Sequence, residues 1–111
     1  MVAEVRSLTE FQAAVGVRSC VFLWAAWHEP SKPGGQMDQV FKQLAEIHQE
    51  DITFLKVEAE AVPEVSEKLE IAMVPTFVLM KGNFVVGKVE GADPPSLAKR
   101  VRAFASEPVE Q

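Results

Sequence analysis

The chain has 111 residues, of which 48% are hydrophobic and 24% are charged, a composition that predicts one folded domain and excludes a disordered protein. Its 11 Lys and Arg against 16 Asp and Glu leave a net charge of −5, so we expect no nucleic acid partner. The longest apolar stretch, residues 20–27, is far shorter than the roughly 20 residues that cross a bilayer, so we expect no membrane partner. The single cysteine, Cys20, cannot form an internal disulfide, which favours a reducing location, the cytoplasm or also the nucleus.

The first half of the chain predicts a strand, a helix and a second strand. Val2 opens a short strand that leads into a helix, where Ser7 and Glu10 have the spacing of a capping box and Gly16 suits the helix end. Residues 20–26 are continuously apolar, which is typical of a central strand that is covered on both faces and has a parallel neighbour. A turn-rich segment, residues 28–35, follows this strand.

The rest of the chain alternates in the same way and ends in a hairpin and a helix. Apolar residues at helical spacing predict a long helix from residue 37, residues 52–57 predict a buried strand, and residues 62–69 predict a short helix. Residues 76–81 and 84–90 predict two strands joined by Gly82-Asn83, and Asp93 caps a last helix. The order β-α-β-α-β-α-β-β-α predicts an α/β domain over residues 1–106, with a central mixed sheet and helices on both faces. Residues 107–111 are expected to form a frayed tail or the start of a linker.

Two motifs resemble the thioredoxin family. The segment 22–32, FLWAAWHEPSK, resembles the family's active-site segment, in which Trp-Ala-x-Trp precedes Cys-Gly-Pro-Cys-Lys at the end of a central strand. The segment 73–77, MVPTF, resembles the loop that holds a cis-proline before a strand, and Gly91 follows the last strand as in that family. These motifs occur in the right order over almost the whole chain, so the resemblance implies a thioredoxin fold.

Three further segments resemble a narrower group, the thioredoxin-like domain of multidomain monothiol glutaredoxins of the PICOT or glutaredoxin-3 type. They are QMDQVF at 36–41, VEAE at 57–60 with PEVSE at 63–67, and EGADP at 90–94. In such proteins the domain precedes glutaredoxin domains whose Cys-Gly-Phe-Ser motif binds glutathione and a bridging [2Fe–2S] cluster. That motif does not occur in this sequence. The resemblance therefore implies no cofactor in this domain, with glutathione and [2Fe–2S] expected only if glutaredoxin domains follow.

The residues that dithiol exchange needs are missing at the matching positions. His28 stands where the family has its attacking cysteine, and Ser31 stands where it has the resolving one. An imidazole cannot form a disulfide and a hydroxyl cannot resolve one, so we expect no catalytic residue at this degenerate motif. Phe22 replaces the buried carboxylate that the family uses for proton transfer, and Pro-Gly-Gly at 33–35 is inserted before the helix. The remaining thiol, Cys20, is expected to be a buried core residue.

A lone histidine beside a carboxylate falls short of a metal ligand set, so we expect no metal site and interpret His28 as a solvent-facing loop residue.

A peptide-binding groove is the second interpretation that the resemblance supports. It implies that Pro75 is a cis-proline and that the backbone of Val74 faces outward, where an extended peptide can pair with it as an added strand. Trp27, Pro30 and Met73 would complete a partly exposed apolar patch for a peptide or partner. The alternative is that the proline only preserves a fold inherited from an enzyme.

Charge is distributed unevenly along the chain. Five glutamates lie between residues 58 and 70, and three cations lie on the last predicted helix. We expect these two sets to face each other, either as ordinary solvated surfaces or as a means of orienting a neighbouring domain. The residues are Glu58, Glu60, Glu64, Glu67 and Glu70, and Lys99, Arg100 and Arg102.

These observations favour a redox-inactive docking or adaptor domain that binds protein partners or neighbouring glutaredoxin domains. The resemblance places such a domain in iron–sulfur cluster trafficking, iron homeostasis and cell redox regulation. Two alternatives stay open: an atypical protein disulfide oxidoreductase, and a chaperone-like protein that binds peptides through the patch around Trp27.

Overall fold

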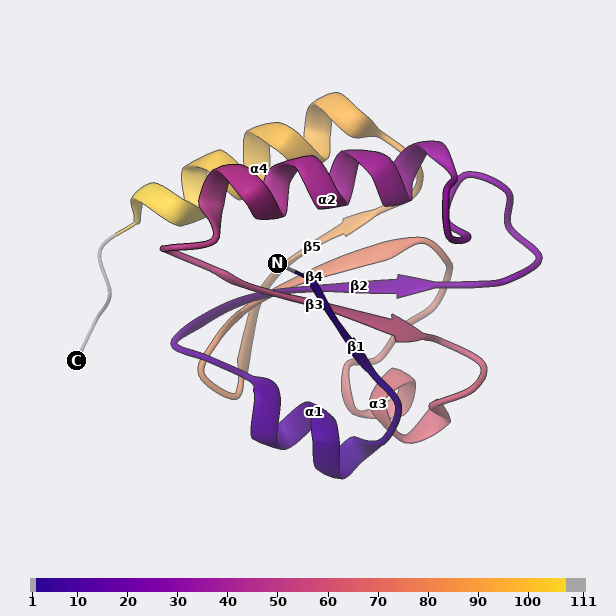
Figure 1. Ribbon diagram of the computed structural model, residues 1–111. Coiled ribbons are helices and arrows are strands. Elements are labelled where there is room, and N and C mark those ends of the chain that lie inside the picture. Colours follow the sequence, from indigo (N-terminus) through magenta and orange to yellow (C-terminus); the bar gives the residue numbers. More distant parts are fainter. Residues whose placement is uncertain (1, 108–111) are drawn as a thin grey trace.

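The computed structural model describes residues 2–107 and shows one mixed β-sheet between two layers of helices (Figure 1). The predicted order of strands and helices is confirmed. Within residues 2–107, no helix has both the length and the apolar character that a membrane crossing requires. The elements are β1 (Val2–Val5), α1 (Leu8–Ala14), β2 (Arg18–Trp24), α2 (Gln36–His48), β3 (Thr53–Glu58), α3 (Pro63–Lys68), β4 (Thr76–Lys81), β5 (Phe84–Glu90) and α4 (Pro94–Ser106).

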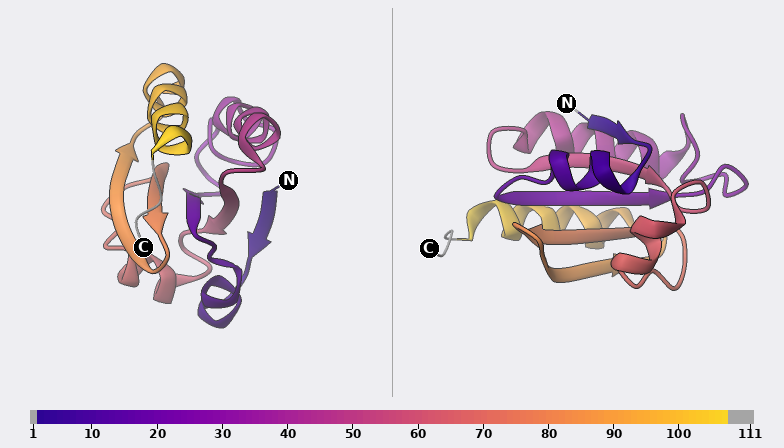
Figure 2. Two further views of the ribbon diagram at one scale, coloured as in Figure 1. Left: turned by 90° about the vertical axis from the view of Figure 1, so that its left-hand side faces the viewer. Right: turned by 90° about the horizontal axis from the view of Figure 1, so that it is seen from below.

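The sheet has the strand order β1-β3-β2-β4-β5. The strands β1, β3 and β2 run parallel, whereas β4 runs antiparallel to both β2 and β5. The helices α2 and α4 cover one face of the sheet, and α1 and α3 cover the other (Figures 1 and 2). The central strand β2 is therefore enclosed on both faces, as its unbroken apolar sequence predicts.

The side chains of β2 alternate between two apolar cores, one on each face of the sheet. Phe22 belongs to the core beneath α2 and α4, where its ring stacks on Phe77 at a centroid distance of 4.5 Å. Phe41 of α2 packs against both rings at 5.1 and 5.9 Å. Val21 and Leu23 point to the opposite core, under α1 and α3. These two cores fix the direction in which β2 delivers the loop that follows it.

The first helix begins as predicted but ends without the expected glycine cap. The Ser7 hydroxyl accepts a hydrogen bond from the Glu10 amide at 3.0 Å, although the Glu10 carboxylate reaches the amide of Arg6 rather than that of Ser7. The helix ends at Ala14 with Val15 as its C-cap, so Gly16 directly follows the helix end as predicted, but it does not adopt the positive φ of a glycine cap. A Cβ at Gly16 would lie 2.6 Å from Oγ1 of Thr53, so this position is small because the chain passes close to β3.

The prediction that the acidic and basic sets face each other is wrong. The glutamates of residues 58–70 lie on and around α3, while the cations lie on α4. These helices cover opposite faces of the sheet, so the sheet separates the two sets (Figure 2). The acidic set is therefore not neutralised from within the domain by α4.

The last described residues hold the end of α4 against the sheet. Glu107 accepts a hydrogen bond from Arg18 through its carbonyl, and its carboxylate forms an ion pair with Lys81 at 3.0 Å. Residues 108–111, most of the predicted tail or linker, lie outside the described residues.

The phenylalanine core predicts that removing a buried ring destabilises the domain much more than removing an exposed ring. Phe77 is fully buried between Phe22 and Phe41, so Phe77→Ala leaves a cavity and should lower the free energy of unfolding by about 3–5 kcal/mol. Phe84 is 76% exposed on β5, so Phe84→Ala should change it by less than about 0.5 kcal/mol. Urea denaturation of both variants measures this, and similar losses for the two would contradict the packing described.

Candidate functional site

The degenerate motif lies in a loop at the carboxyl end of β2, ahead of α2. Backbone hydrogen bonds fold the loop on itself, including His28 N–H to Ala25 O at 3.1 Å and Met37 N–H to Pro30 O at 2.7 Å. A Cβ at Gly35 would lie 2.2 Å from the Glu29 carbonyl, so the close return of the loop requires glycine there. Because α2 begins only at Gln36, the motif positions precede the helix and do not occupy its amino terminus. The loop thus lacks the helix placement that lowers a thiol pKa in redox enzymes.

His28 and Ser31 contact each other inside this loop. His28 Nδ1 lies 3.1 Å from Ser31 Oγ, and Ser31 is fully buried, where its hydroxyl also accepts a hydrogen bond from the Ala25 amide at 3.3 Å. The Ser31 hydroxyl therefore fastens the loop to the end of β2. His28 is half-buried and packs edge-on against Trp27, so the expectation of a simple solvent-facing residue is only partly correct.

Cys20 is a core residue of β2. Its side chain has no exposed surface, and burial raises the pKa of its thiol far above the ordinary value. It stands four residues before Trp24, which is about 13 Å along a strand at ~3.3 Å per residue. The thiol is therefore both inaccessible and remote from the loop that carries the degenerate motif.

A groove of about 420 Å³ opens beside this loop, between Trp27, residues 59–60, α3 and the segment before β4. Trp27 is 66% exposed and Met73 is 46% exposed, and both line the groove together with Val74. The other predicted members, Pro30 and Pro75, do not line it, since Pro75 is buried and the Pro30 carbonyl bonds to the start of α2. The structure therefore brings three of the five predicted binding residues together at one surface.

The backbone at Val74 has unused hydrogen-bonding groups. The Val74–Pro75 peptide bond is cis. The neighbouring carbonyls are occupied, because Thr76 Oγ1 donates to Met73 O at 2.7 Å and Gly91 N–H donates to Pro75 O at 2.9 Å. Among residues 2–107, neither the N–H nor the C=O of Val74 has a hydrogen-bond partner. A half-buried amide without partners beside an apolar groove is available to an extended chain.

A buried ion pair beneath the loop is a feature that the sequence did not reveal. The Asp38 carboxylate on α2 lies 2.5 Å from Lys56 Nζ on β3, and both side chains are almost inaccessible. The same carboxylate accepts the Gly34 amide at 2.9 Å and pairs with Lys42 at 3.0 Å. Burial by itself would raise the pKa of Asp38, but the Gly34 hydrogen bond and the two lysines outweigh it and hold the pKa below its ordinary value.

Lys56 also lies beside Phe22, the residue at the position where the family has a buried carboxylate. These two residues are direct neighbours across β2 and β3, and the ammonium lies 5.7 Å from the Phe22 ring centre and 5.2 Å from that of Trp24. With an aromatic ring beside it instead of a carboxylate, Lys56 takes its negative partner from Asp38 on the overlying helix. The one feature of the sequence that could have indicated this ion pair is a lysine inside an apolar strand, since a lysine is almost never fully buried unless it is paired.

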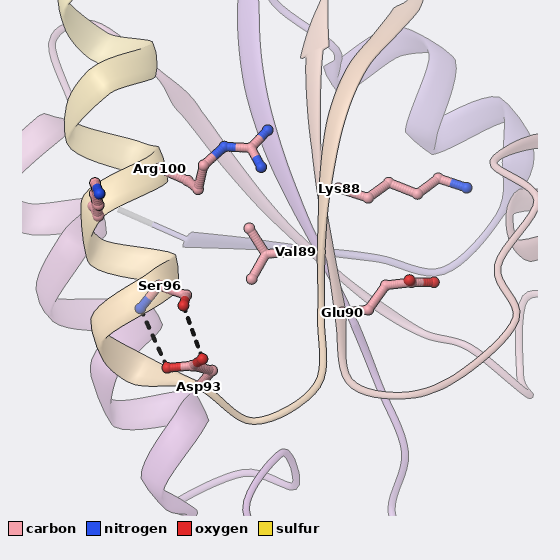
Figure 3. Close-up of a pocket in the computed structure, with 7 residues that line it drawn as sticks. Lys88, Val89, Glu90, Asp93, Ser96 and Arg100 are labelled. Carbon is pink, nitrogen blue, oxygen red and sulfur yellow. Dashed lines mark hydrogen bonds between the residues drawn. The ribbon is translucent and has the colours of Figure 1, made fainter.

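A second groove, of about 330 Å³, lies between β5 and α4 (Figure 3). Val89 and Arg100 face each other there, whereas Lys88 and Glu90 point to the other side of the strand (Figure 3). Asp93 caps α4 by accepting from the Ser96 amide at 3.3 Å and from its hydroxyl at 2.8 Å. The Asp93 carboxylate thus occupies the amino terminus of α4 at this groove.

Within residues 2–107, no three His, Cys, Asp or Glu side chains are grouped so that they could hold a metal ion.

Comparison with known proteins gives the family. The family model described as "Thioredoxin" matches residues 3–103. The chain belongs to the thioredoxin family. Curated relatives include glutaredoxin-3 of Bos taurus, 41% identical over 109 residues, and monothiol glutaredoxin-S11 of Oryza sativa subsp. japonica, 45% identical over 106 residues. These alignments cover 95% and 94% of the chain but only 31% and 21% of the relatives, so the chain corresponds to one portion of much longer proteins.

Solved structures show the same fold. A thioredoxin of Malassezia sympodialis superposes with a TM-score of 0.87, covering 96% of this chain and 92% of that one at 24% identity. The predicted thioredoxin fold, with its mixed sheet and helices on both faces, is therefore confirmed.

The buried ion pair predicts a strong effect of removing one partner. Asp38→Asn leaves Lys56 with no full counter-charge in the core and should lower the free energy of unfolding by about 3–5 kcal/mol. Replacing both charges, as in Asp38→Leu with Lys56→Met, should cost less than about 2 kcal/mol, because no buried charge is left over.

The same pair predicts an acid dependence with a definite sign. The folded-state pKa of Asp38 lies below the unfolded value of about 3.9, so its contribution is present above that pH and is lost as the pH falls through the folded pKa. Urea denaturation between pH 2.5 and 7 should show a steeper acid loss for wild type than for the double variant. Parallel curves would show that Asp38 is not held in this pair.

Proposed function

We propose that this domain docks an extended segment of a protein partner in the groove beside Trp27 and performs no thiol chemistry. The observation that carries the proposal is a contrast within one site. The two redox positions hold His28 and Ser31, while the adjoining surface keeps an exposed indole, an apolar groove and the unpaired backbone of Val74.

The absence of exchange follows from the chemistry of the groups present. Disulfide exchange needs an accessible thiolate to attack and a second thiol to resolve the mixed disulfide. Ser31 is buried and carries no sulfur, and the Cys20 thiol is buried with a raised pKa. These features support a domain that binds without transferring electrons, in contrast to an atypical disulfide oxidoreductase.

The docking mode uses the unpaired backbone groups of Val74, in the segment before β4. An extended peptide can donate to the Val74 carbonyl and accept from its N–H, while one of its side chains enters the groove lined by Trp27 and Met73. Backbone pairing supplies register and the groove supplies selectivity.

The names of the relatives suggest the kind of full-length protein in which this domain would act. Within a longer monothiol glutaredoxin, this domain would recruit client proteins or position glutaredoxin domains. Glutathione and a [2Fe–2S] cluster would belong to those domains, since this chain has no Cys-Gly-Phe-Ser motif. Its contribution to iron–sulfur trafficking, iron homeostasis and redox regulation would then be made through binding.

Removal of the exposed indole tests the groove. Peptides selected from a random 12-residue display library on the wild-type domain should bind Trp27→Ala at least tenfold more weakly, because Trp27 forms one wall of the groove. Phe84→Ala is the matched control, since it removes another exposed aromatic ring, on β5, which does not line the groove. Fluorescence anisotropy gives the affinities, and thermal melts of both variants should stay within about 2 °C of wild type.

Two results would contradict docking in this groove. Equal affinities for wild type and Trp27→Ala would place the peptides elsewhere. Binding of all unfolded chains without sequence preference would favour the chaperone-like alternative.

A further inference from the structure

We infer that the groove is selective for a basic segment, one that places an apolar side chain beside Lys or Arg. This inference rests on the proposed docking function and specifies the chemistry of its partner. It is carried by one carboxylate at the rim of the groove and by the unpaired charge around it.

The floor and walls of the groove select an apolar anchor. Apart from Trp27, Glu60 and Ser66, its lining consists of aliphatic side chains and Met73. Ser66 does not face a ligand with a free hydroxyl, because its Oγ donates to the Ala59 carbonyl at 2.8 Å. An aliphatic or aromatic side chain of a partner can therefore enter without leaving a polar group unsatisfied.

Glu60 is the one charged residue in this lining. Its Oε1 accepts a hydrogen bond from Trp27 Nε1 at 2.7 Å, so the carboxylate is held against the exposed indole. The backbone beneath it is also fixed, since Ala59 N–H donates to Trp24 O at 2.9 Å. The second carboxylate oxygen has no partner within residues 2–107 and remains available to a cation. A guanidinium or ammonium bound there would also lie near the Trp27 ring, which attracts cations.

The chain segment that surrounds the groove also carries negative charge. Residues 58–73 contain five glutamates and one lysine, and none of those carboxylates forms an ion pair in the described part of the chain. Lys32 pairs with the Glu29 carboxylate and Lys88 donates to the Glu70 carbonyl, while Lys68, the one lysine of residues 58–73, leaves that segment with a net charge of five negative against one positive. The α4 cations lie behind the sheet. A basic partner therefore meets a rim of net negative charge, whereas an acidic partner is repelled.

The test compares peptide selections on three proteins with one random 12-residue display library. Wild type should enrich peptides with Lys or Arg next to a large apolar residue. Glu60→Gln should lose this enrichment, because the glutamine carbonyl still accepts the Trp27 hydrogen bond while the charge is gone. Glu46→Gln is the control, since it removes one exposed carboxylate from α2, on the opposite face of the sheet.

The peptide that binds wild type most tightly is then used to measure how much its basic residues contribute to affinity. Replacing its basic residues by Gln should weaken binding about fivefold at low salt, less at 0.5 M salt, and hardly at all on Glu60→Gln. Basic enrichment that persists on Glu60→Gln, or is absent on wild type, overturns the inference. The docking function survives that outcome as long as the selected peptides still need Trp27. If no peptide binds wild type, both the inference and the docking function fail.

Discussion

The loop that carries the site depends on one carboxylate that joins it to the core. Lys56 is built into β3 among aromatic rings, and a buried ammonium without a counter-charge would destabilise the fold. Asp38 supplies that charge from α2 and at the same time holds the amide of Gly34 in the loop. The inserted loop is therefore fastened to the sheet through the same carboxylate that neutralises Lys56. Trp27 itself is held by its hydrogen bond to Glu60 and its edge contact with His28.

Disulfide exchange and the shape of the groove depend on different residues in this domain. Chemistry depends on two side chains, and both positions now hold groups that serve the loop, with Ser31 bonded to Ala25 and His28 bonded to Ser31. Shape depends on the course of β2 and β4 and on the turn at Val74, which the two apolar cores maintain. The groove and the turn at Val74 therefore do not depend on a pair of sulfur atoms at positions 28 and 31.

The sequence predicted the elements well wherever one local rule decided them. The unbroken apolar run of β2, the Gly82-Asn83 hairpin and the Asp93 cap all occur as expected. Prediction failed where the answer depended on distant parts of the chain. Gly16 is small because Thr53 passes close by, and Asp38 is buried because Lys56 lies opposite it in space. Of the site, Trp27, Met73 and Val74 were found by resemblance, but Glu60 was read only as one of several acidic surface residues.

The most direct measurement of the central claim is reduction of insulin by dithiothreitol in the presence of this domain, with an active thioredoxin run in parallel. We expect precipitation at the rate of dithiothreitol alone, because the motif carries no sulfur and Cys20 is buried. Turnover above that rate would contradict the account, and it would do so most clearly if Cys20→Ser then abolished it.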